Sequence, residues 1–197
     1  MFLTTTEWGS CMYSESAKSK TVCFSGHRPE KLPESSSVIK VLKSLLYKEI
    51  IDSMENGYDT FVTGLARGVD LWAGDIILKL KAQGKNIKLV AAAPYKGHGS
   101  KFYGADKFIL GNIMLYADEV VYISEKYTKW CLLKRNEYMV DRSGKLIAMV
   151  SDYKSGTGAT IRYAQKKGIV TKIIDVGHLN EQITAAEEYT DPDIVVF

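Results

Sequence analysis

The stretch T-F-V-T-G-L-A-R-G-V-D, residues 60–70, decides the fold of this 197-residue chain. Its first four residues are all β-branched or aromatic and predict a short buried strand, and the glycines after them predict a tight turn. An amphipathic helix over 71–82 follows and ends at Gly84, and a second apolar run over 87–93 is closed by Pro94. Strand, helix and strand in this order predict a βαβ unit with two parallel strands.

The same alternation of short apolar runs and amphipathic segments continues on both sides of this unit. Further strands are expected over 21–25, 119–123, 146–150 and 169–174, and further helices over 38–54, 106–116, 132–140 and 160–167. The pattern predicts the α/β class: a Rossmann-like three-layer sandwich with a mostly parallel sheet of about six strands. Phe108 and Trp130 lie at helix positions typical of a core.

The chain is expected to form one domain with short additions at both ends. Residues 1–19 are rich in Thr, Ser and Lys without periodicity and are interpreted as an N-terminal tail or arm. Residues 20–197 then form the single domain, with a C-terminal extension from about 180. This extension carries a helix-like run over 181–189 and an apolar run over 194–197.

Composition excludes several classes of protein. Hydrophobic residues make up 46% and charged residues 25% of the chain, which is typical of a globular protein and excludes disordered and fibrous classes. No apolar run approaches the ~18 residues of a membrane span, so we expect a cytoplasmic protein with no membrane partner. Three cysteines and three histidines at wide spacing predict no metal site, and no cofactor is expected.

The charge balance bears on partners. Twenty-six basic and 23 acidic residues give a formal net charge of +3, too small to indicate a dedicated nucleic-acid surface. Nucleic acid stays open as a partner but is not favoured, and assembly into a homo-oligomer also stays open.

Polar and glycine-rich turns follow four of the expected strands. In open α/β sheets ligands bind beyond the carboxyl ends of the strands, so these turns are the candidate ligand site. The candidate residues are Ser25, Gly26, His27, Arg28, Gly64, Arg67, Gly68, Asp70, Pro94, Tyr95, Gly156, Thr157, Gly158 and Thr160.

Two of these turns suggest phosphate chemistry. Gly64 and Gly68 let backbone amides approach an anion, and the planar cation of Arg67 can bind phosphate through two N–H groups. The turn over 156–160 opens a helix, where free N–H groups, hydroxyls and the helix dipole converge. The structural alternative is that the glycines only shape turns, that Asp70 caps a helix, and that Arg67 is solvated.

The other two turns leave more open. His27 is as well explained by a structural role as by ligand contact, whereas Arg28 favours binding because an unpaired guanidinium is rarely buried. Tyr95 can stack on a base or cover the core.

Five motifs follow one another along the chain. They are T-V-C-F-S-G-H-R-P-E-K-L (21–32), V-T-G-L-A-R-G-V-D (62–70), A-A-P-Y (92–95), N-E-Y-M-V-D-R-S (136–143) and G-T-G-A-T-I-R-Y-A (156–164). Taken in order, these motifs resemble the YpsA-like proteins of the SLOG superfamily, which is named after the SMF/DprA and LOG proteins. The resemblance covers about residues 20–176 and implies a Rossmann-like fold whose strand-end loops bind a nucleotide or nucleotide-derived ligand, with an ADP-ribose-like ligand favoured. It is consistent with a sensor or sequestering module.

Two alternatives come from other branches of the superfamily. The LOG enzymes, which hydrolyse the N-glycosidic bond of nucleoside monophosphates, carry P-G-G-x-G-T-x-x-E with a catalytic Glu. Alignment on Gly158 places Arg162 at that Glu, which argues against this hydrolase activity or base transfer unless Asp70, Asp141 or Asp152 supplies the carboxylate. The stretch G-L-A-R-G-V-D also resembles DprA, a single-stranded DNA binder, and makes DNA binding the third alternative.

Overall fold

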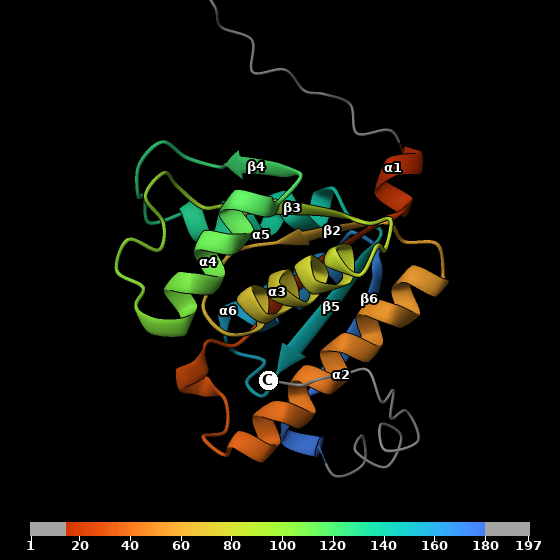
Figure 1. The fold of residues 1–197 in the computed structure, drawn as a ribbon, viewed down its shortest axis with the longest axis horizontal. Coiled ribbons are helices and arrows are strands. Elements are labelled where there is room, and N and C mark those ends of the chain that lie inside the picture. Colours follow the sequence, from red (N-terminus) through yellow and green to blue (C-terminus); the bar gives the residue numbers. More distant parts are fainter. Residues whose placement is uncertain (1–14, 180–197) are drawn as a thin grey trace, which may run out of the picture.

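The computed structural model describes residues 15–179, in which strands and helices alternate (Figure 1). The strands are β1 (Thr21–Gly26), β2 (Thr60–Thr63), β3 (Lys88–Ala93), β4 (Glu119–Tyr122), β5 (Lys145–Val150) and β6 (Val170–Asp175). The α-helices are α1 (Glu15–Ser19), α2 (Ser36–Glu55), α3 (Val69–Ala82), α4 (Gly104–Tyr116), α5 (Cys131–Asp141) and α6 (Gly156–Lys166). Two short 3-10 helices are η1 (Pro29–Lys31) and η2 (Val176–His178).

The six strands form one parallel sheet in the order β4-β3-β2-β1-β5-β6. This arrangement confirms the predicted α/β class and Rossmann-like sandwich. The chain runs outward from β1 to β4, then crosses the sheet through α5 and returns to β5 beside β1. The carboxyl ends of β1 and β5 therefore flank the point where the strand order reverses, the usual ligand position in such sheets.

Alternate residues of each strand enter two separate cores. Phe24 and Phe61, whose rings stack with centroids 6.2 Å apart, lie in the larger core together with side chains of α2, α3 and α4. Cys23 and Val62 point the other way and pack with side chains of α5 and α6. Figure 1 shows α2, α3 and α4 on one side of the sheet, so that helices cover both faces.

The predicted strand limits agree with the structure to within one residue. The largest difference is α6, which begins at Gly156 instead of residue 160, because the hydroxyl of Ser155 accepts the N–H of Gly158 and caps an earlier helical turn. The core prediction for Phe108 and Trp130 is wrong, since both side chains are exposed.

At the ends of the described chain, residues 15–19 of the predicted arm form α1, which is tied to β1 by a 2.8 Å hydrogen bond from the Thr21 hydroxyl to the Ala17 carbonyl. The runs expected over 181–189 and 194–197 lie outside the described residues. Within residues 15–179, no helix has both the length and the apolar character that crossing a membrane requires.

Candidate functional site

Two adjoining hollows lie at the carboxyl edge of the sheet, and Arg28, Ala66 and Leu132 line both. The central hollow, of about 280 Å³, is lined in addition by Ser25, Gly26, His27, Lys31, Asp70, Arg135, Asn136, Ser155, Gly156 and Thr157. The lateral hollow, of about 680 Å³, is lined in addition by Arg67, Tyr95, His98, Gly99, Ser100, Lys101, Phe102 and Tyr127.

The structure thus brings most of the predicted site residues together. The turns after β1, β2 and β5 meet at the central hollow, and the turns after β1, β2 and β3 meet at the lateral hollow. Five predicted residues line neither hollow: Gly64, Gly68, Pro94, Gly158 and Thr160.

Two glycines let the turn after β1 pack against the start of α3. A Cβ on Gly26 would overlap the side chain of Val69, so any side chain there would displace α3. Gly68 has a φ of +85°, and a Cβ there would lie 2.5 Å from the carbonyl oxygen of His27. Their role in the structure is close packing, which sets the shape of the central hollow.

His27 holds the turn after β5. Its Nε2 atom accepts the backbone N–H groups of Ser151 at 2.9 Å and of Asp152 at 3.1 Å. An accepting Nε2 requires the neutral tautomer with the proton on Nδ1, and burial lowers the pKa of His27 in agreement. His27 therefore has a structural role, and because it also lines the central hollow, its contact with a ligand stays a prediction.

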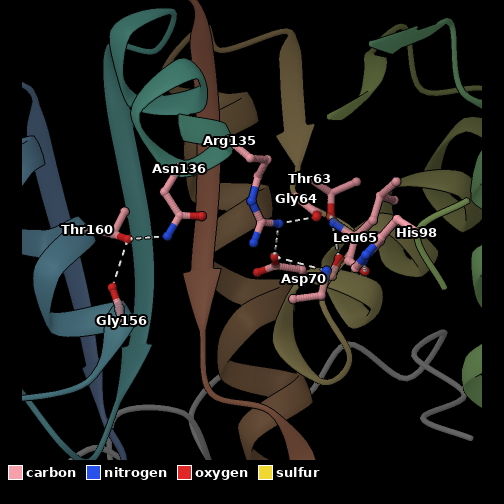
Figure 2. A network of polar contacts seen from close by, with 10 residues as sticks. Thr63, Gly64, Leu65, Asp70, His98, Arg135, Asn136, Gly156 and Thr160 are labelled. Carbon is pink, nitrogen blue, oxygen red and sulfur yellow. Dashed lines mark hydrogen bonds and ion pairs between the residues drawn. The ribbon is translucent and has the colours of Figure 1, made fainter. Parts of the chain in front are cut away.

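A buried ion pair joins α3 to α5 at the wall of the central hollow. Arg135 Nη1 lies 3.1 Å from Asp70 Oδ2, and the two side chains are only 7% and 4% exposed. Arg135 also donates to the carbonyl of Gly64 (Figure 2). The N–H of Ala66 donates to Asp70 Oδ2. A Cβ on Gly64 would overlap the Arg135 guanidinium, so this glycine admits the arginine and is not a phosphate cradle.

Two atoms of this pair have unmet hydrogen-bonding capacity. Asp70 Oδ1 and Arg135 Nε are buried and have no hydrogen-bond partner among the described residues. Burial raises the pKa of Asp70, and the charge of Arg135 opposes that rise. Both atoms are closed off from solvent, so this unmet capacity is a cost of burying the ion pair.

The start of α6 offers free donors to the central hollow. The N–H groups of Gly156 and Thr157 donate to no described residue, and the N–H of Gly158 is taken by the Ser155 hydroxyl. Gly158 is required for packing, because a Cβ there would overlap the carbonyl oxygen of Tyr153. Two N–H groups and the positive end of the helix dipole therefore face the hollow.

Thr160, a predicted ligand residue, is already engaged within the protein. Its hydroxyl donates to the carbonyl of Gly156 at 3.0 Å and accepts from the Asn136 amide at 2.8 Å (Figure 2). Figure 2 also shows that the neighbours Asn136 and Arg135 reach in different directions, one toward α6 and the other toward the turn after β2. α5 therefore connects two of the turns that form the site.

The cations of the site differ in their partners. The guanidinium of Arg67 is bound by Glu30 of η1 and by Asp106 of α4, the latter at 2.6 Å, so its charge is already balanced. Lys31 pairs with Asp152 at 3.3 Å, where both side chains are exposed and the pair is weak. Arg28 has no ion pair with any residue of the described range and lines both hollows. It is the cation best placed to meet an anion.

The lateral hollow is aromatic. Tyr95 meets the rings of His98 and Tyr127 edge to face, each with centroids 5.5 Å apart, and His98 meets Phe102 in the same way at 5.4 Å. His98 Nε2 lies 3.0 Å from the carbonyl oxygen of Leu65, a residue held at a φ of +61°. Pro94 is buried directly after β3, and Tyr95, which follows it, lines the hollow.

The remaining candidate charges lie apart from the central hollow. Asp141 is the last residue of α5 and precedes β5, which places it at the amino edge of the sheet, where it binds Lys167 at 2.6 Å. Asp152 is held by Lys31 and by the N–H of Lys154. Arg162 is exposed and donates to the carbonyl of Tyr153 at 2.8 Å.

Arg135 was not among the residues predicted from the sequence. A signal exists, since Cys131, Arg135 and Met139 are spaced by four and all are buried on one face of α5. An arginine within an apolar stripe indicates a buried partner.

Among solved structures, the chain resembles DNA processing protein A of Helicobacter pylori, described as binding single-stranded DNA, with a TM-score of 0.57 and 20% identity over 87% of this chain and 74% of that one. The same protein of Streptococcus pneumoniae gives a TM-score of 0.57 and 20% identity over 84% of this chain and 57% of that one. At this identity the likeness shows the fold alone.

Sequence relatives point to one family. The SPbeta prophage-derived protein YoqJ of Bacillus subtilis is 29% identical over 70% of this chain and 84% of its own length. A UPF0398 protein of Halalkalibacterium halodurans is 26% identical over 75% of this chain and 81% of its own. The family model described as the YspA SLOG family matches residues 22–176, well over half of the chain. The protein therefore belongs to the YpsA family of SLOG proteins.

Proposed function

We propose that the protein binds a nucleotide-derived small molecule, of the ADP-ribose type, with a phosphate in the central hollow, and that it acts as a sensor or sequestering module. The observation that carries this proposal is the joint position of the unpaired Arg28 guanidinium and the free N–H groups of Gly156 and Thr157 at the point where the strand order reverses. A cation and a helix N-terminus facing one cavity favour a phosphate.

Two further features support an anion at this place. Lys31, whose ion pair with Asp152 is exposed and weak, adds a cation to the wall, whereas Arg135 and Asp70 balance each other. A volume of about 280 Å³ is at the lower end for ligand cavities and suits a phosphate with part of its sugar.

Binding without catalysis is favoured by the carboxylates. Asp70 is the one carboxylate among the residues that line the central hollow, and Arg135 holds it in an ion pair. A general acid for glycosidic cleavage needs a carboxyl group that is free to exchange a proton with the leaving base. Incubation with AMP should therefore release no adenine, and release with many turnovers would favour the hydrolase alternative.

The test is thermal denaturation with ADP-ribose and AMP, followed by calorimetric titration. A ligand present at 100 times its dissociation constant stabilises the folded state by about 2.7 kcal/mol. Arg28→Gln should weaken binding by about 1 to 3 kcal/mol, the scale of a hydrogen bond to a charged group. The control is Lys85→Gln, which removes an exposed charge from the turn after α3, at the amino edge of the sheet. Equal affinities of the two variants would contradict the proposal.

A further inference from the structure

The lateral hollow is not needed to hold a phosphate, yet it is the larger of the two and opens beside the central one. Arg28, Ala66 and Leu132 line both, so a molecule seated in the central hollow has direct access to the lateral hollow. A volume of about 680 Å³ is within the range of cavities that hold organic ligands. The two hollows together fit a ligand with two chemically different ends.

The walls of the lateral hollow are suited to a flat aromatic ring. Tyr95, His98, Phe102 and Tyr127 all line it, and their edge-to-face contacts fix the rings relative to one another before any ligand arrives. Tyr127 is 65% exposed, so most of its ring surface is uncovered by the protein. Aromatic side chains of this kind bind nucleobases by stacking, with little preference for one base.

The charged groups on the walls of the two hollows indicate where each end of the ligand binds. Two of the cations that line the hollows have no close carboxylate partner within residues 15–179. They are Arg28, on the wall between the hollows, and Lys101, on the lateral wall. Arg67 also lines the lateral hollow, but Glu30 and Asp106 neutralise it. The free N–H groups of Gly156 and Thr157 at the start of α6 belong to the wall of the central hollow, and the aromatic rings belong to the wall of the lateral one. The phosphate therefore goes to α6 and the base goes to the aromatic end.

We infer that the lateral hollow is a nucleobase subsite and that the ligand is a free nucleotide, with its phosphate at α6 and its base against Tyr95 and Tyr127. This inference rests on the proposed function and assigns the part of the ligand that selects for a nucleotide over a sugar phosphate. Ribose 5-phosphate fills only the central hollow, whereas AMP fills both.

The experiment is calorimetric titration of the full chain with AMP and with ribose 5-phosphate. Tyr127→Ala should weaken AMP binding by about fivefold or more, the lower limit for loss of one stacked base, and should leave ribose 5-phosphate binding unchanged. Tyr127→Phe keeps the ring and should keep the AMP affinity. Tyr116→Ala is the matched control, because Tyr116 is 62% exposed on α4 and lines neither hollow.

The outcomes separate the two proposals. If Tyr127→Ala and Tyr116→Ala bind AMP equally well, while Arg28→Gln still weakens ribose 5-phosphate, the base subsite is wrong and the phosphate site stands. If neither AMP nor ribose 5-phosphate responds to Arg28→Gln, the phosphate site itself is wrong. If a single-stranded oligonucleotide binds more tightly than AMP and depends on Tyr127 equally, the assignment to a free nucleotide is overturned.

Discussion

Removing one member of the Asp70–Arg135 pair should destabilise the protein strongly. The Arg135→Met variant would leave the carboxylate of Asp70, whose side chain is 4% exposed, without its counter-charge. Breaking a buried ion pair from one side costs about 3 to 5 kcal/mol, because the remaining charge is neither solvated nor paired. This is a large fraction of the roughly 5 to 15 kcal/mol that is typical of folded domains.

The double variant Asp70→Asn, Arg135→Met tests the cause of this loss. The amide that replaces the carboxylate would be neutral and could still accept the N–H of Ala66, so no uncompensated charge remains in the wall. We expect the double variant to lose less stability than the sum of the two single variants, by about 2 kcal/mol, a coupling typical of residues in direct contact. Urea denaturation measures the free energy of unfolding of the two single variants and of the double variant relative to the parent protein, provided that the m-values are equal. Strict additivity of the two single changes would refute the reasoning.

The remaining predictions concern the turn after β5. Gly158→Ala should lower the free energy of unfolding several times more than Gly156→Ala does, as measured by urea denaturation. The new Cβ would overlap the Tyr153 carbonyl oxygen in the first variant, whereas it meets nothing within 4 Å in the second. Equal losses in the two variants would contradict the packing role of Gly158. Burial lowers the pKa of His27 from 6.5, so below that pH the unfolded chain binds more protons than the folded one. The stability that neutral His27 contributes above about pH 6.5 should therefore be lost as the pH falls through the lowered pKa. His27→Gln should reduce this loss between about pH 7 and about pH 5, and an unchanged pH profile would show that His27 does not contribute to it.

The fold could be predicted from the sequence because its signals are local. Strand runs such as 60–63 and 146–150 are bounded by turns and separated by helices of the right length, so only a parallel sheet accommodates them. The order of strands in the sheet depends on the crossing between β4 and β5, which no local pattern specifies.

The site could be predicted only in part, because ion pairs join residues far apart in the chain. The turn that contains Arg67 predicts a phosphate ligand, but the Arg67 guanidinium forms an ion pair with Asp106 of α4. Gly64 is predicted to let backbone amides approach a phosphate. In the structure, its lack of a side chain makes room for Arg135, which lies 71 residues later in the chain. The turn after β5 could be placed beside the other turns because it directly follows a strand, but the cap from Ser155 to Gly158, which starts α6 at residue 156, was not predicted.

A crystal structure of the protein with AMP tests the central claim most directly. The account predicts the phosphate in the central hollow, within hydrogen-bond distance of the Arg28 guanidinium and of the N–H groups of Gly156 and Thr157. A third hollow, of about 500 Å³, lies at the amino edge of the sheet and is lined by Lys20, Asp59 and Lys88 among others. AMP bound there, or bound at the carboxyl edge with its phosphate away from α6, would contradict the account.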